Sequence, residues 1–106
     1  MAHCPLELLD DLADLLARVR SWVGVVEKSP GVFYVHGQRF LHFHLVKGGG
    51  RRGDIKGRAG WMQLDLPRPI AAARWRALSR ELQAQYGERE RPLARVRRRR
   101  PDRRGR

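Results

Sequence analysis

Apolar residues recur at steps of three and four between residues 5 and 23, which predicts an amphipathic helix near the start of the chain. Pro5 suits the first turn of this helix, and the acidic residues that follow suit the positive end of the helix dipole. The buried side of the helix is expected to carry Leu8, Leu9, Leu12, Leu15, Leu16 and Val19.

Four segments with β-strand patterns follow, at residues 31–35, 39–46, 54–58 and 61–66. A second helix is predicted over residues 70–86, with Pro69 at its start and Gly87 at its end. The order helix, four strands, helix predicts an α+β fold in two layers. Both helices are expected to cover one face of a four-stranded antiparallel sheet.

The strands at 31–35 and 39–46 are expected to pair as a hairpin. Alternation along the second of them sets two groups of side chains on opposite faces: Leu41, Phe43 and Leu45 on one, Phe40, His42 and His44 on the other. A three-residue loop at 36–38 keeps Phe33 and Val35 on the aliphatic side, whereas a two-residue loop sets them beside the histidines. The three-residue loop is favoured, because it gives one sheet face on which all the side chains are apolar.

The chain has 106 residues, 42% of them hydrophobic, which fits one globular domain with a modest core. Its net charge of +12 is unevenly distributed along the chain. Residues 88–106 hold ten arginines and three acidic residues, a net charge of +7, which leaves +5 for residues 1–87. We therefore expect a single α+β domain over residues 1–87 and a disordered Arg-rich tail over residues 88–106.

Cys4 is the single cysteine, so the chain cannot form an internal disulfide or a thiolate zinc cluster, and a reducing cytoplasm is the expected compartment. The sequence shows no signal-peptide pattern, and no apolar run approaches the roughly 20 residues of a membrane span. No membrane partner is expected.

The sharpest chemical motif is the His-x-His pair at His42 and His44, which sets two imidazoles on one strand face about 7 Å apart at Cα. Such a pair can chelate a divalent metal when a carboxylate or a third histidine joins it. His36 at the hairpin turn and Asp54 at the next strand are the candidates. The alternative is that the histidines lie solvated or hydrogen-bonded on a sheet face, and that Asp54 neutralises Arg51, Arg52 or Lys56.

Nucleophilic and acid–base catalysis have little support in the sequence. Cys4 lies on the N-terminal segment, Ser29 in a Pro–Gly turn and Ser79 on a helix, and no carboxylate pair with a suitable spacing stands near the histidines. No catalytic residue is assigned, no cofactor other than a metal is indicated, and the sequence favours a protein that is not an enzyme.

The glycine run at 48–50 precedes basic residues, a pattern typical of a basic loop or an anion cradle. It lacks the Lys-Ser/Thr ending and the following helix of a phosphate-binding loop. Together with the Arg-rich tail it predicts contact with nucleic acid or another polyanion through charge. The residues expected to make this contact are Lys47, Arg51, Arg52, Lys56, Arg58, Arg95, Arg97, Arg98, Arg99 and Arg100.

Outward-facing aromatic residues add a second possible contact, because Tyr34, Trp61 and Trp75 can stack on bases, although Trp at helical spacing usually belongs to a core. The alternative for the tail is a solvated extension encoded by a GC-rich gene. A third hypothesis is a homodimer formed through the histidine-bearing sheet face.

The stretch SPGVFYVHGQRFLHFH, followed by DIKG and flanked by two helices, resembles the small bacterial YjbR-like proteins over residues 28–57. The shared features are the PGV lead-in, a strand–glycine–strand hairpin and a later strand with a lysine. The hairpin histidines and the triple glycine depart from the family pattern. The resemblance implies a fold similar to double-wing DNA-binding domains and a DNA-binding role, with no catalytic residue to carry over.

Overall fold

The computed structural model describes the backbone of residues 2–104 and the side chains of residues 3–89. Its strands are β1 (Ala2–His3), β2 (Val25–Ser29), β3 (Val32–Val35), β4 (Gln38–Leu45), β5 (Arg51–Gly57) and β6 (Gly60–Asp65). Its helices are the 3₁₀ helix η1 (Leu6–Leu12), α1 (Ala13–Ser21) and α2 (Ala72–Arg104). The predicted first helix is therefore present as η1 followed directly by α1.

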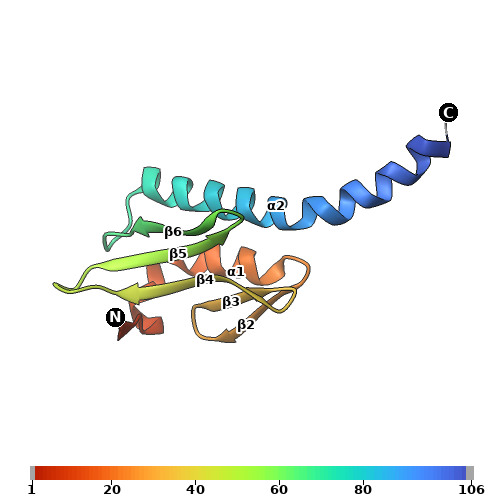
Figure 1. Cartoon of the computed structure of the whole chain (residues 1–106). Coiled ribbons are helices and arrows are strands. Elements are labelled where there is room, and N and C mark those ends of the chain that lie inside the picture. The colour runs from red at the N-terminus through yellow and green to blue at the C-terminus, as the bar shows by residue number, and fades with distance from the viewer. Residues whose placement is uncertain (1, 105–106) are drawn as a thin grey trace.

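The strands form one antiparallel sheet in the order β2-β3-β4-β5-β6, with β1 paired to the end of β4 (Figure 1). The four predicted strands are all present in this order, so the α+β class and the meander are confirmed. The four predicted strands did not include β1 or β2. The prediction also began β5 three residues late, because Arg51–Gly53 belong to the strand and not to the glycine loop.

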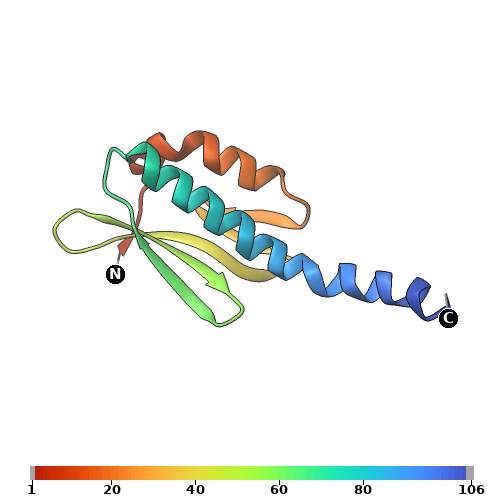
Figure 2. The ribbon, with the colours of Figure 1, turned by 90° about the horizontal axis from the view of Figure 1, so that it is seen from above.

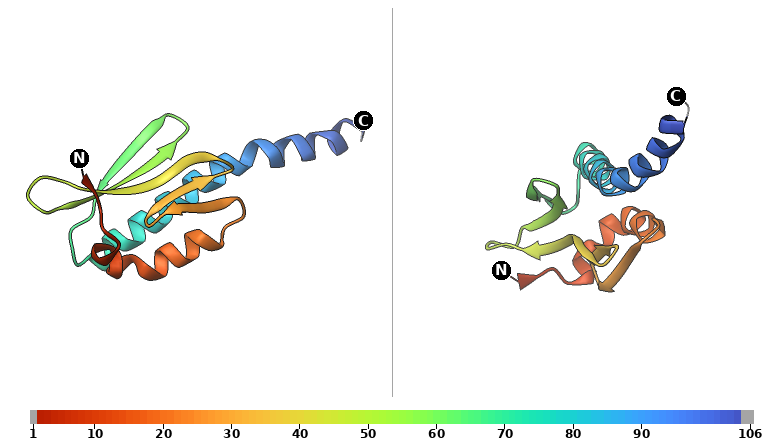
Figure 3. Two further views of the ribbon diagram at one scale, coloured as in Figure 1. Left: turned by 90° about the horizontal axis from the view of Figure 1, so that it is seen from below. Right: turned by 45° about the vertical axis from the view of Figure 1, so that its right-hand side comes forward.

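Both helices pack on one face of the sheet, as expected, and Figures 2 and 3 show α1 and α2 on the same side of the strands. The core between the layers is formed by leucines of the helices and by alternate residues of the strands. Its fully buried members include Leu15, Leu16, Leu78, Leu82, Phe33, Phe43 and Ile55. Gly53 lies opposite Phe43 in this core, and a Cβ on it would stand 3.0 Å from Leu66 Cδ1.

The β3–β4 hairpin turns on two residues, His36 and Gly37, with φ of 50° and 81°. The predicted three-residue loop is therefore wrong. Phe33 nevertheless pairs with Leu41, because a bulge leaves Phe40 without a partner and shifts the register. The bulge turns Phe40 into the core beside Leu41, so Phe40 does not share the outer face with the histidines.

Arg51, at the start of β5, has a fully buried guanidinium whose five N–H groups all meet acceptors. It donates to both carboxylate oxygens of Asp11 at 2.6 and 2.9 Å, and to the carbonyls of Leu8, Leu66 and Pro67 at 2.7–3.0 Å. These bonds tie β5 to η1 and to the loop that leads into α2.

Asp11 completes this anchor from η1. Burial by itself would raise the pKa of the Asp11 carboxyl, but hydrogen bonds from Arg51 and from the backbone N–H of Ile70, together with the charge of Arg51, outweigh burial and lower it. The carboxylate therefore stays ionised and paired at neutral pH.

Helix α2 continues beyond the sheet to Arg104, so the molecule measures 60 Å along its longest axis and 27 and 24 Å across (Figure 1). The predicted end of the helix at Gly87 is therefore wrong, whereas the disorder of the tail over residues 88–106 stays a prediction. A glycine inside a helix costs only about 1 kcal/mol, so Gly87 by itself does not end α2. Among the described residues, no helix is long and apolar enough to cross a membrane.

Replacing Arg51 with Gln is expected to lower the free energy of unfolding by about 3–5 kcal/mol, because Asp11 and three backbone carbonyls would lose their buried partner. Arg68→Gln is the matched control, because it removes an exposed pair with Asp10 that is worth roughly 0–1 kcal/mol. Urea unfolding followed by circular dichroism measures both losses. Equal losses in the two variants would contradict the anchoring role of Arg51.

Candidate metal centre

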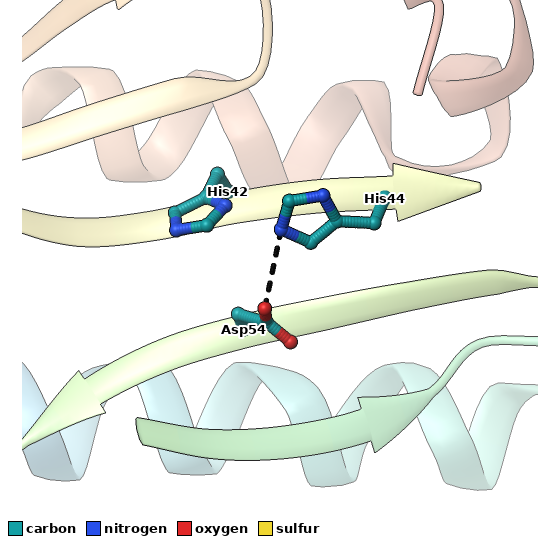
Figure 4. Close-up of side chains that lie close together, drawn as sticks. All are labelled: His42, His44 and Asp54. Atoms are coloured by element: carbon teal, nitrogen blue, oxygen red, sulfur yellow. Dashed lines mark ion pairs between the residues drawn. The ribbon is translucent and has the colours of Figure 1, made fainter. Parts of the chain in front are cut away.

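The register between β4 and β5 sets His42 directly opposite Asp54, and His44 opposite Arg52. All four side chains lie on the sheet face opposite the helices, because alternation sends Leu41, Phe43 and Ile55 into the core. Figure 4 shows the two imidazoles side by side on β4, with the Asp54 carboxylate reaching towards them from β5. Three of the four residues expected to form a metal cluster are therefore brought together.

The spacing of the three side chains approaches that of a chelate. His44 Nε2 lies 3.2 Å from Asp54 Oδ2, and one ligand atom from each of His42, His44 and Asp54 lies within 4.8 Å of the others. A tetrahedral ion with bonds of 2.0–2.1 Å places its ligand atoms roughly 3.4 Å apart. His44 Nε2 and Asp54 Oδ2 already have this spacing, and the ligand atom of His42 lies within 4.8 Å of them.

Both imidazoles carry a buried nitrogen that lacks a hydrogen-bond partner among the described residues, Nε2 in His42 and Nδ1 in His44. The His42 ring is held edge-on between two other rings, with centroids 4.6 Å from that of His44 and 4.8 Å from that of Trp61. A buried polar atom without a partner normally costs free energy, so this pair of rings calls for a ligand or another explanation.

The protonation state of His42 favours metal binding. Burial lowers the pKa of its imidazole, and the nearby charges of His44, Arg39 and His3 lower it further, against an opposing effect of Asp54. The ring is therefore neutral at pH 7, which leaves a lone pair free for an ion.

Asp54 is also bound to a protein cation, because Arg52 donates from Nε to Oδ1 at 2.9 Å and from Nη2 to Oδ2 at 3.2 Å. This agrees with the alternative interpretation, in which Asp54 neutralises Arg52. The guanidinium fixes the carboxylate and opposes the entry of a cation. The site therefore suits metals that bind imidazole strongly, such as Zn²⁺, Ni²⁺ or Cu²⁺, better than Mg²⁺ or Ca²⁺.

His36 does not join the cluster. Its backbone N–H donates to the carbonyl of Gly24 at 2.9 Å, and its ring packs against Gly24 at the turn between β3 and β4. His3 lies on the strand beside the cluster, because β1 pairs it with His44, and its Nε2 lies 3.0 Å from the carbonyl of Pro30. Sequence patterns did not indicate His3, since a two-residue strand leaves no periodic signal.

The cations expected to contact nucleic acid are dispersed over the described part of the chain. Arg51 is buried and cannot make such a contact, which corrects the prediction for this residue. Arg52 is engaged with Asp54, and Arg58 pairs with Glu88 at 3.2 Å. Lys47 is exposed on the glycine loop, and Lys56 lies over the ring of Trp61. The side chains of Arg95, Arg97, Arg98, Arg99 and Arg100 lie outside the described residues.

No family model, curated protein or solved structure matches this chain. The resemblance to the YjbR-like proteins, the homodimer and the cytoplasmic location therefore stay predictions.

A chelator-treated protein is expected to lose stability as the pH falls from 7.5 to 5.5, in part because of His42. Since its folded-state pKa lies below the ordinary value of about 6.5, the unfolded chain binds a proton in this window that the folded chain does not. His42→Gln is expected to flatten this dependence, and His36→Asn to leave it unchanged. Urea unfolding at the two pH values measures the effect, and an unchanged slope in His42→Gln would contradict it.

Proposed function

We propose that this protein binds a divalent transition-metal ion through His42, His44 and Asp54 on the open face of its sheet. The observation that carries the proposal is the meeting of two imidazoles and a carboxylate at near-ligand spacing, with one ligand atom from each of the three side chains within 4.8 Å of the others. Imidazole and carboxylate together form the common protein ligand set of zinc. The proposal concerns binding and assigns no reaction.

Rigid surroundings support this site. His42 and His44 stand on a central strand that has neighbours on both sides, and Asp54 stands on the next strand, which Arg51 anchors to η1. Ligands held on regular elements need little reorganisation to meet an ion, and this lowers the cost of binding. Trp61 shields one side of the His42 ring from water.

Titration of the chelator-treated protein with Zn²⁺ or Ni²⁺ is expected to show one site per chain by isothermal calorimetry. His42→Gln and His44→Gln are each expected to raise the dissociation constant at least tenfold, since even outer-shell partners of a metal site are worth 10–100-fold. His36→Asn, which also removes one imidazole but lies at the hairpin turn, is expected to bind as the wild type does. Equal binding by all four proteins would exclude this site.

We also propose that the Arg-rich end of the chain binds nucleic acid or another polyanion. The observation that favours this second function is the net charge of +7 on residues 88–106, together with a helical backbone that carries residues 88–104 away from the sheet (Figure 1). Each arginine that neutralises a phosphate releases a condensed counterion, so the interaction is expected to depend steeply on salt.

Replacing Arg97, Arg98 and Arg99 together with Gln is expected to make the salt dependence of duplex DNA binding less steep by up to roughly 2.7 logarithmic units per tenfold change in salt. Arg74, Arg76 and Arg80 provide a matched triple replacement, because they are exposed and stand on the same helix beside the sheet. Fluorescence anisotropy over a salt series measures both slopes. The same slope in both triple variants would contradict a role for the end of the chain.

A further inference from the structure

A row of two aromatic and two basic side chains crosses the open face of the sheet, from β3 to β6. Tyr34 pairs with Arg39, and Lys56 pairs with Trp61. Because Leu41 pairs with Ile55, Lys56 stands beside the bulge at Arg39 and Phe40. The row therefore reads aromatic, cation, cation, aromatic, and we call Tyr34, Arg39, Lys56 and Trp61 the aromatic–basic row.

The two aromatic side chains of this row are accessible. Trp61 is 40% exposed, although a large apolar ring is normally buried, and it projects from an edge strand on the face without helices. Tyr34 is half-buried and borders a hollow of about 170 Å³ that Arg39 and His42 also line. Neither ring is needed for the core, which lies on the other side of the sheet.

Cations already lie against both rings. The ammonium of Lys28 stands 4.7 Å from the centroid of Tyr34, and that of Lys56 stands 5.4 Å from the centroid of Trp61. Such exposed pairs are worth only about 0.5–1 kcal/mol, so a planar ligand can displace them. Arg39 is exposed beside them, and none of the described ion pairs engages it.

Negative charge near the row is largely neutralised. Asp54, the acidic residue opposite His42, is paired with Arg52 and His44. Asp65 stands at the far end of β6, opposite Arg52. The surface around Tyr34 and Trp61 is therefore positive. The whole chain is positive too, with a net charge of +12.

We propose that the aromatic–basic row binds single-stranded nucleic acid, with bases stacked on Tyr34 and Trp61 and phosphates held by Lys28, Arg39 and Lys56. Three strand spacings of about 4.8 Å separate the two rings, roughly 14 Å in all, which leaves room for the backbone between the stacked bases. Open sheets with aromatic rings and flanking cations bind single strands in this way, since stacking requires unpaired bases.

This inference rests on the proposed polyanion binding, and it adds a surface and a preference that the Arg-rich end does not provide. Arginines that contact phosphate bind duplex and single strand alike, because they read charge. The aromatic–basic row binds only the single strand. The row also touches the candidate metal centre, because Trp61 packs against His42, so a bound strand would lie beside that centre.

The test measures binding of the full-length protein to a labelled single-stranded oligonucleotide and to the matching duplex, with chelator present. Trp61→Leu and Tyr34→Leu are each expected to weaken single-strand binding roughly 5- to 100-fold and to leave duplex binding unchanged. Trp61→Phe keeps a ring for stacking and is expected to restore most of the affinity. Lys47→Gln, on the distant glycine loop, is expected to change single-strand binding less than Arg39→Gln does.

Three results would overturn the proposal. In the first, Trp61→Leu and Tyr34→Leu bind the single strand as tightly as the wild type, while the Arg97/Arg98/Arg99 variant loses both ligands; the end of the chain then acts alone. In the second, each ring variant keeps the circular dichroism spectrum of the wild type but loses single strand and duplex equally, so the rings do not discriminate between the two ligands. In the third, the wild type binds neither ligand at low salt, and the polyanion proposal fails with this one.

Discussion

The buried Arg51–Asp11 ion pair is the constraint on which the geometry of this molecule depends. A guanidinium removed from water is tolerated only when its charge and all its donors are matched, and here a carboxylate and three carbonyls match them. The bonds fix the start of β5 against η1 and against the loop into α2. Since the side-chain period of a strand is two residues, fixing β5 also fixes which side chains face outwards, and so it sets Asp54 opposite His42.

As a result, the two faces of the sheet differ in composition: the inner face is apolar and the outer face is largely polar. The inner face and the helices bury the apolar side chains, and Phe40 joins them through the bulge. The outer face carries histidines, an ion pair and two accessible aromatic rings, and it bears no helix in the described structure. A buried polar atom without a partner is costly to folding, and His42 Nε2 is such an atom beside the His44–Asp54 pair, which is consistent with a ligand at this place.

Much of this fold follows from local patterns in the sequence. Leucine spacing identified the first helix, and alternation identified β3, β4, β5 and β6 and the shared face of His42 and His44. The bulge at Phe40 and the buried state of Arg51 could not be predicted, because both depend on contacts between distant segments. An arginine beside a glycine loop looks like a surface cation until Asp11, 40 residues earlier, is placed against it. Likewise, only tertiary pairing shows that Asp54, and not His36, meets the histidine pair.

The most direct test of the account is the position of a metal in crystals grown with Zn²⁺, located by anomalous scattering at the zinc edge. The account predicts one strong peak per chain within about 2.0–2.2 Å of His42, His44 and Asp54, with Arg52 still bound to the far carboxylate oxygen. A map whose peaks lie only at other surface groups, with the His44–Asp54 contact unchanged, would contradict it.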